Sequence, residues 1–205
     1  MATGRSVEHH GGTIWQKADC LGKLIPMRDS APFLFFYWEV SQMKKVGVVM
    51  GSTSDLPVVE KAIAVLQEYG VPVEVRVLSA HRCPDEAREF AASARSGGFS
   101  VLIAAAGMAA HLAGALAANT TLPVIGIPCA GAKLDGMDAL LSTVMMPSGI
   151  PVATVAVDGA KNAALLAIEI MAVTDETLAA KLEQARAADT AKVLAADKEL
   201  REKYK

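Results

Sequence analysis

The chain has 205 residues, of which 52% are hydrophobic and 20% are charged, so it can bury a core of its own. With 20 Lys and Arg against 22 Asp and Glu, its formal net charge is −2, which argues against binding a long polyanion such as DNA. The mean hydropathy is +0.32, yet no apolar run approaches the roughly 20 residues of a membrane span. We therefore expect a soluble protein with no nucleic-acid or membrane partner, whose surplus apolar surface forms subunit interfaces.

Residues 1–43 differ in character from the rest of the chain. They contain both tryptophans, and neither a helical nor a strand period persists through them. The apolar run at 31–38 is too short for an export signal and is interrupted by Pro32. We expect a disordered N-terminal extension, and two origins stay open: translation upstream of a true start at Met43, or an ordinary flexible arm. The mass of the intact native protein distinguishes the two.

From residue 44 onward, short apolar runs alternate with Ala-rich segments of helical period, which is typical of a parallel sheet with crossover helices. This pattern predicts a three-layer α/β domain over 44–174, with helices on both faces of the sheet, and a C-terminal helix over 175–205 that packs on the domain or on a neighbour. The predicted buried strands are Val46–Met50, Val73–Leu78, Val101–Ala105, Val124–Ile127 and Val152–Val157. The predicted helices are approximately Asp55–Tyr69, Pro84–Ser96, Met108–Asn119, Met137–Met145, Ala160–Ala172 and Asp175–Lys205.

The chain's cysteines give no sign of a disulfide or metal framework. Cys20, Cys83 and Cys129 are an odd number and have no C-x-x-C spacing. We expect no metal and a reducing, cytoplasmic location.

The end of the first predicted strand is a candidate anion site, since ligands of open parallel sheets bind beyond the carboxyl ends of the strands. It reads Gly51-Ser52-Thr53-Ser54-Asp55, a tight turn with hydroxyls and a carboxylate at the start of a helix. The unpaired N–H groups and the dipole of that helix favour a phosphate, although a plain helix cap explains the same residues. The turn lacks the Lys of a P-loop and the glycine pattern of a dinucleotide fold, so ATP and NAD are not expected.

The end of the second predicted strand reads Ser79-Ala80-His81-Arg82-Cys83-Pro84-Asp85. Imidazole exchanges protons near neutral pH and guanidinium is a permanent cation, so His81 beside Arg82 indicates acid/base chemistry on an anionic substrate. A loop histidine is more often structural, but the folded region holds only His81 and His111, and both follow strands. Nothing near Cys83 in the sequence would activate it as a nucleophile.

The end of the third predicted strand, from Ala104 to Gly114, is dense in small residues that let the backbone approach a flat ligand. Tight packing of helix on sheet, or of subunits, explains the same composition. His111 is expected about one turn into the following helix, as a supporting or structural residue. Two flexible loops at 131–136 and 145–151 are candidates to cover a ligand at this rim.

Six short motifs occur in order between Val46 and Ala172, at consistent separations. They are Gly51-Ser52-x-Ser54-Asp55, Ser79-Ala80-His81-Arg82-x-Pro84-Asp85, Ala109-Ala110-His111-Leu112, Leu122-Pro123-Val124-Ile125-Gly126, Met146-Pro147-x-Gly149-Ile150-Pro151-Val152-Ala153-Thr154 and Asn162-Ala163-Ala164. Together they resemble the bacterial 5-(carboxyamino)imidazole ribonucleotide mutases of purine biosynthesis. The N-terminal extension has no counterpart in that family.

The resemblance implies a flavodoxin-like parallel sheet, a homo-octamer in which the C-terminal helix reaches a neighbour, and a small ribonucleotide as substrate. The implied reaction, on the way to IMP, moves a carboxylate from the exocyclic N5 nitrogen to C4 of the aminoimidazole ring, without metal, ATP or organic cofactor. By the same analogy His81 carries the proton, and the ribose phosphate is held by Ser52, Ser54, Asp55, Ser79 and Arg82. Four further residues are assigned to the substrate: Ala80, Gly107, His111 and Leu112.

Three residues depart from the usual pattern of the family beside the presumed ring pocket. Met108 stands where a second glycine is common, Ala113 where proline is common, and Met145 where glutamine is common. Arg82 favours the mutase, because a related animal-type form that carboxylates aminoimidazole ribonucleotide directly typically has Lys there. That direct carboxylase stays open as an alternative, as do a distant nicotinate-nucleotide carboxylase and a flavodoxin-like module that only binds a nucleotide or a protein.

Overall fold

The computed structural model describes residues 44–131 and 134–205, so the predicted N-terminal extension at 1–43 lies outside the described residues. Within these ranges the strands are β1 (Lys45–Met50), β2 (Val73–Val77), β3 (Phe99–Gly107), β4 (Val124–Cys129) and β5 (Ala153–Thr154). The helices are the 3₁₀ turn η1 (Thr53–Asp55), α2 (Leu56–Glu68), α3 (Pro84–Ser93), α4 (Leu112–Ala117), α5 (Met137–Val144), α6 (Ala160–Ala172) and α7 (Glu176–Lys203).

The sheet is parallel throughout, with the strand order β2-β1-β3-β4-β5. This is the flavodoxin-like order, in which the winding reverses between β1 and β3. Val48 of β1 pairs with Val75 of β2 on one side and with Ile103 of β3 on the other. The predicted fold class is confirmed. It places the carboxyl ends of β1 and β3 side by side, at the point where such sheets bind their ligands.

The last predicted strand, Val152–Val157, was too long. Only Ala153 and Thr154 form a ladder, with Ile125 and Gly126 of β4. Pro151 lacks the N–H that an earlier pairing needs. Beyond Thr154 the chain follows β4 only through isolated hydrogen bonds, such as Val155 N–H to Gly126 O at 3.1 Å.

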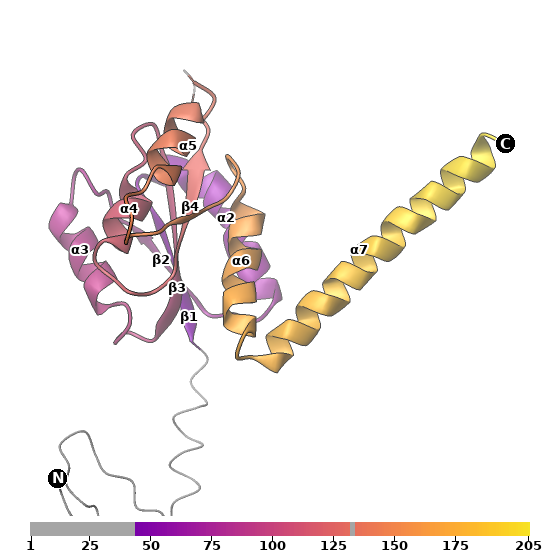
Figure 1. The fold of residues 1–205 in the computed structure, drawn as a ribbon, viewed down its shortest axis with the longest axis horizontal. Coiled ribbons are helices and arrows are strands. Elements are labelled where there is room, and N and C mark those ends of the chain that lie inside the picture. Colours follow the sequence, from indigo (N-terminus) through magenta and orange to yellow (C-terminus); the bar gives the residue numbers. More distant parts are fainter. Residues whose placement is uncertain (1–43, 132–133) are drawn as a thin grey trace, which may run out of the picture. The chain divides into compact units, whose positions relative to one another are not determined.

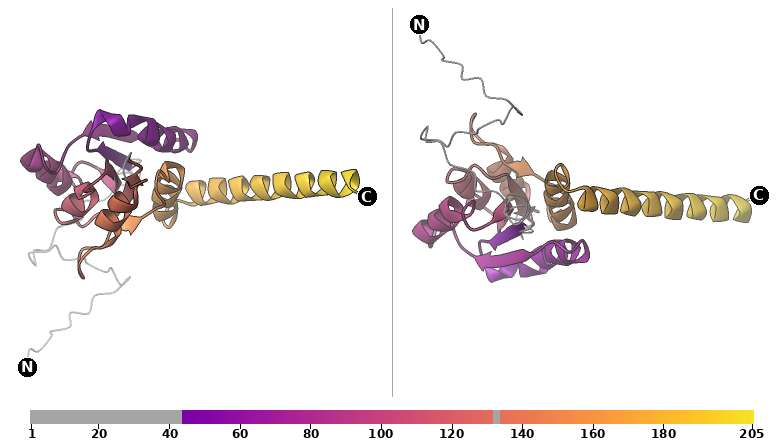
Figure 2. Two further views of the ribbon diagram at one scale, coloured as in Figure 1. Left: turned by 90° about the horizontal axis from the view of Figure 1, so that it is seen from above. Right: turned by 90° about the horizontal axis from the view of Figure 1, so that it is seen from below.

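Two helical layers cover the sheet (Figure 1, Figure 2). Alternate residues of β1 point to opposite layers, as the pleat of a strand requires. Val46, Val48 and Met50 are buried with α2 and α6. Val49 is buried on the other face with α3 and α4. Both faces of β1 are therefore dry, which explains its continuous apolar sequence.

Gly126 of β4 is a point of very close approach between the sheet and α5. A Cβ built there would overlap Thr143 Cγ2 and lie 3.1 Å from Val152 Cγ1. Thr143 is buried and β-branched, so its methyl group cannot swing aside. We predict that Gly126→Ala lowers the free energy of unfolding by about 1–3 kcal/mol, as overpacking does, in a chemical denaturation experiment. Gly131→Ala is the control, because a Cβ there meets no atom of the described residues within 4 Å; equal losses in both variants would contradict the packing argument.

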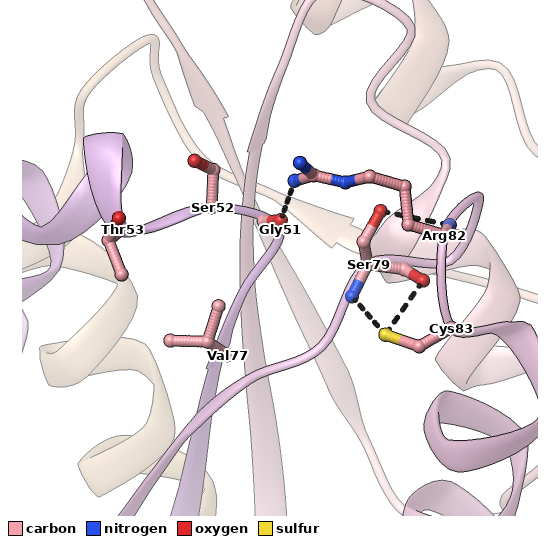
Figure 3. Close-up of a pocket in the computed structure, with 7 residues that line it drawn as sticks. All are labelled: Gly51, Ser52, Thr53, Val77, Ser79, Arg82 and Cys83. Carbon is pink, nitrogen blue, oxygen red and sulfur yellow. Dashed lines mark hydrogen bonds between the residues drawn. The ribbon is translucent and has the colours of Figure 1, made fainter.

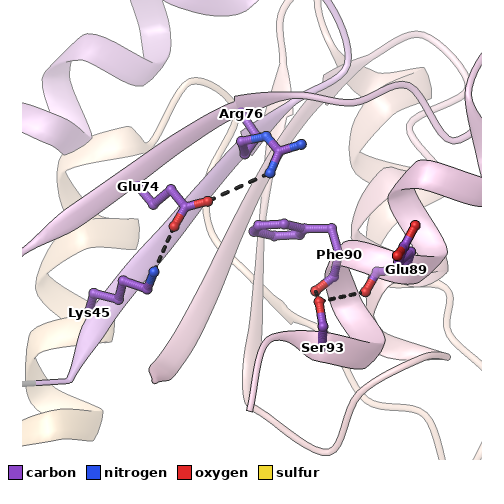
Figure 4. Close-up of polar contacts among 6 residues, drawn as sticks. All are labelled: Lys45, Glu74, Arg76, Glu89, Phe90 and Ser93. Atoms are coloured by element: carbon purple, nitrogen blue, oxygen red, sulfur yellow. Dashed lines mark hydrogen bonds and ion pairs between the residues drawn. The ribbon is translucent and has the colours of Figure 1, made fainter. Parts of the chain in front are cut away.

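Ion pairs and a cation–π contact fix the edge strand β2 to its neighbours near the amino-terminal end of the sheet (Figure 4). Lys45 Nζ donates to Glu74 Oε2 at 2.7 Å, and Arg76 lies 3.6 Å from the other oxygen of Glu74. The hydrogen bond from Lys45, helped by the charges of Lys45 and Arg76, lowers the pKa of Glu74 against the opposing effect of burial. Arg76 also lies over the ring of Phe90 in α3, 5.3 Å from its centroid. These charged contacts link β2 to β1 and to α3.

The predicted C-terminal helix is present as α7, which extends beyond α6 in Figure 1. The side chain of Asp175 caps it by accepting hydrogen bonds from the N–H groups of Thr177 and Leu178. Leu178 and Leu182 are buried, whereas every residue from Arg186 to Lys205 is exposed. Helices of the described ranges are all too short or too polar to cross a bilayer.

Candidate active site

The turn after β1 places hydroxyl groups at the start of a helix. Ser52 has an extended backbone, and its Oγ accepts a hydrogen bond from the N–H of Ser54 at 3.3 Å. The 3₁₀ turn that follows leads directly into α2, with Asp55 at the N-cap position. The positive end of the α2 dipole therefore faces the Ser52–Asp55 turn, where an anion is stabilised.

The loop after β2 contacts this turn through Arg82 (Figure 3). Its guanidinium donates to the carbonyl oxygen of Gly51 at 2.8 Å, and its backbone N–H donates to Ser79 Oγ at 3.3 Å. A permanent cation is thus held beside the hydroxyl-rich turn. The two loops and the end of β2 line an open cavity of about 260 Å³, formed by Gly51, Ser52, Thr53, Val77, Ser79, Arg82 and Cys83.

Cys83 closes the β2 loop on itself, which the sequence did not indicate. Its Sγ accepts from the N–H of Ser79 at 3.0 Å and donates to the carbonyl oxygen of Ser79 at 3.3 Å (Figure 3). The backbone N–H of Cys83 donates to the same oxygen at 2.9 Å. These bonds hold the five residues from Ser79 to Cys83 in a tight turn, so Cys83 supports the loop rather than acting on a ligand.

The loop after β3 differs from the sequence-based prediction. The strand continues to Gly107, and α4 begins only at Leu112, so His111 is the N-cap residue and not one turn inside the helix. The reason is Met108, whose backbone φ of 52° is left-handed and cannot belong to a right-handed helix.

His81 and His111, from different loops, form a pair. Nε2 of His81 lies 3.2 Å from Nδ1 of His111, and the two rings are perpendicular with centroids 5.4 Å apart. One ring must donate and the other accept, and either tautomeric arrangement satisfies the bond. In either arrangement one N–H group lies between the two rings.

A second cavity, of about 500 Å³, adjoins the first at Gly51, Ser52, Ser79 and Arg82. Every residue predicted for the site lines it: Ser52, Ser54, Asp55, Ser79, Ala80, His81, Arg82, Gly107, His111 and Leu112. Its wall also contains five residues that the sequence placed near the site without a role of their own, and one, Ala130, that it did not indicate: Gly51, Ala106, Met108, Ala109, Ala130 and Gly131. Ala130 has a small side chain with no chemical signal of its own, so its place on the wall follows only from the assembled loops.

Burial raises the pKa of two acidic groups in this region, the carboxyl of Asp55 and the thiol of Cys129. Burial raises the pKa of Asp55 above its usual value, against weaker opposite effects of hydrogen bonds with Ser52 and Ser54. Burial, together with the charges of Asp55 and Asp158, raises the pKa of Cys129 to about 12. Cys129 is therefore a thiol at neutral pH and no nucleophile. Among the residues that the structure describes, no three His, Cys, Asp or Glu side chains gather as a metal site would need.

Two of the three residues that depart from the family's usual pattern, Ala113 and Met145, do not line the cavity. Ala113 is buried in the core with α3, because it is on the sheet-facing side of α4. Met145 is exposed at the end of α5 and is absent from the cavity wall. The loop at 145–151 likewise contributes no residue to that wall, whereas Gly131 of the other predicted loop does; residues 132–133 of that loop lie outside the described residues.

The sequence model of one family, described as AIR carboxylase, matches residues 45–192. The chain belongs to this family. The match contains all three loops of the candidate site. Its relatives include the N5-carboxyaminoimidazole ribonucleotide mutase of Pyrococcus horikoshii, 54% identical over 142 residues, which are 69% of this chain and 80% of that protein. The protein of the same name from Methanocaldococcus jannaschii is 51% identical over 158 residues, 77% of this chain and 98% of that protein.

A solved structure with a similar fold supports the observed architecture. The crystal structure of Treponema denticola PurE matches with a TM-score of 0.70 and 28% identity, over 76% of this chain and 97% of that one. The family assignment and the observed strand order are thus consistent with each other.

Proposed function

We propose that the chain is a 5-(carboxyamino)imidazole ribonucleotide mutase, an isomerase of cytoplasmic purine biosynthesis. The observation that carries the proposal is the joint position of His81, Arg82 and the Ser52 turn on one cavity wall. Two relatives that are 54% and 51% identical to this chain are named N5-carboxyaminoimidazole ribonucleotide mutase, which supports the same substrate for this chain.

The smaller cavity suits the ribose phosphate. The helix start at α2 offers a positive dipole end, Ser52 and Ser79 offer hydroxyls, and Arg82 offers a guanidinium fixed by its bond to Gly51, while Ser54 adjoins from the larger cavity. Burial destabilises the charged form of the Asp55 carboxylate, which lines the larger cavity. Hydrogen bonds from the ribose hydroxyls would stabilise that charge. The base of the nucleotide then extends into the larger cavity, toward the two histidines.

The histidine pair suits the proton transfers of the reaction. Protonation of N5 breaks the bond to the carboxylate and releases carbon dioxide; C4 of the ring then bonds to that carbon dioxide and loses its proton. One acid/base suffices, because it receives at the end the proton that it gave at the start. His81 is that group, and the 3.2 Å bond to His111 lets a proton move between the rings as His81 changes from donor to acceptor.

The small residues around the cavity suit the ring and the released gas. Ala80, Ala106 and Gly107 allow a flat heterocycle to lie close to the backbone. A lining of this kind offers carbon dioxide few water molecules to react with while the second bond forms.

An assay with two substrates tests the proposal. The purified chain should convert N5-carboxyaminoimidazole ribonucleotide to its 4-carboxy isomer without added bicarbonate. Turnover of aminoimidazole ribonucleotide that needs high bicarbonate would favour the direct carboxylase, the activity named in the family's description. Turnover of neither substrate would favour a binding module.

We also propose that the chain works as a homo-octamer, as the family resemblance implies. Two exposed apolar surfaces support subunit contacts: Met137, Leu141 and Val144 on α5, and Val193 and Leu200 on α7. The last two lie on the same helical face as the buried Leu178 and Leu182, so the stripe continues past the domain.

The α7 stripe leads to a prediction for the assembly. Light scattering should give about eight times the chain mass of 21.4 kDa, and Leu200→Asp should lower it, because a charge on the stripe opposes burial against a neighbour. Lys198→Asp places the same group on the opposite side of the helix and should leave the mass unchanged. A Leu200→Asp protein of unaltered mass would remove α7 from the interface.

A further inference from the structure

Met108 occupies a backbone conformation that its residue type does not favour. It is one of three non-glycine residues with positive φ in the described ranges, and the other two, Asp135 and Asp158, have short polar side chains that tolerate it better. The side chain is 72% exposed, so the strain is not compensated by burial in the core. Glycine would make the same turn without strain. A strained residue at a functional site invites a functional explanation for its side chain.

The position of Met108 supplies that explanation. It follows Gly107 at the end of β3, and its carbonyl oxygen accepts from the N–H of Ala110 at 2.9 Å, so its turn sets the place of His111. Met108 lines the larger cavity together with His81 and His111. Among the described residues, it is the largest exposed apolar side chain on that wall.

We propose that Met108 covers the substrate's ring and closes the cavity around the carbon dioxide released from it; this rests on the proposed function. A thioether on a flexible, unbranched chain is polarizable and adapts to the face of a flat heterocycle. Carbon dioxide carries no charge, so only the walls of the cavity hold it between the breaking of the bond to N5 and the formation of the bond to C4. If it escapes, the protonated N5 has already become an amine, and the enzyme releases aminoimidazole ribonucleotide and carbon dioxide in place of the isomer.

Three substitutions at one position test this. Met108→Gly removes the side chain and the strain, Met108→Ala removes the side chain but keeps the strain, and Met108→Leu keeps an apolar cover. We expect the Gly and Ala variants to raise KM roughly tenfold or more, the usual effect of losing an apolar contact in a pocket. Both should also release several times more free aminoimidazole ribonucleotide per turnover than the wild type, and Leu should restore both quantities. The melting temperature of Met108→Gly should be no lower than that of the wild type.

Each other result overturns the inference. If Met108→Ala behaves like the wild type and only Gly differs, the backbone and not the side chain matters. If Met108→Gly changes the molar mass of the assembly, the residue is a subunit contact. If the wild type rearranges the substrate and all three variants match it, Met108 has no role while the proposed function stands. A wild type without rearrangement removes the proposed function itself.

Discussion

Replacing His81 with asparagine is expected to lower kcat for the rearrangement of N5-carboxyaminoimidazole ribonucleotide by roughly 10²–10⁴-fold, with little change in KM. Asparagine is of similar size and can still form hydrogen bonds, but it cannot take up and return a proton at neutral pH. The phosphate contacts come from other side chains, those of Ser52 and Arg82, so substrate binding should persist. Steady-state kinetics with the carbamate substrate measure the loss, and thermal unfolding checks that the variant is folded.

His111→Asn is the matched control for this experiment. It breaks the same 3.2 Å contact from the other side but leaves His81 in the cavity. We therefore expect a smaller loss in kcat than for His81→Asn, because His81 is still present to move the proton but has lost the ring that positions it. Normal turnover by His81→Asn would show that another group moves the proton. Equal losses in both variants would make the pair, and not His81 alone, the acid/base.

The parts of the fold that could be predicted are those fixed by local apolar pattern. β1 and β4 are short apolar runs, and α2 and α6 have helical periods with apolar faces, so their existence follows from side-chain burial. β2 was predicted as a buried strand, but it is an edge strand that alternates valine with charged residues and is largely exposed. The alternation of predicted strands with predicted helices indicated a parallel sheet. The strand order, and with it the meeting of the loops, followed only from the family resemblance.

The errors occurred where tertiary structure overrides local preference. The Ala-rich segment around Met108 has high helix propensity, yet the turn required after β3 is left-handed at that residue and delays α4 to Leu112. Val152–Val157 has the composition of a strand, but the ladder offered by β4 is used only at Ala153 and Thr154. Propensity does not contain this information, because both outcomes depend on a neighbouring element.

The candidate site shows the same division. His81, Arg82 and the Ser52 turn have side chains whose chemistry is recognisable in the sequence, and the structure places them on one cavity. The contact of His81 with His111 and the closure of the loop by Cys83 depend on distances across loops, which a sequence does not give. The residue whose role changed most between sequence and structure is therefore His111, from a helix interior to the partner of His81.

Arg82→Met is expected to raise KM for the ribonucleotide by about 10–100-fold, with a smaller effect on kcat. A hydrogen bond to a charged group contributes about 1.5–3 kcal/mol, and 1.4 kcal/mol corresponds to a factor of ten in affinity. Methionine keeps much of the length of the side chain, so the loss reflects the charge and the donor groups of Arg82. Arg82→Lys should recover part of the affinity, because it restores the charge without the planar fork that reaches both phosphate and Gly51 O. Arg88 on α3, paired with Asp85 on the surface, provides the control: Arg88→Met removes the same charge outside both cavities and should leave KM unchanged. If both substitutions to Met raise KM alike, Arg82 acts only through the net charge of the protein, and the phosphate must be held by other groups.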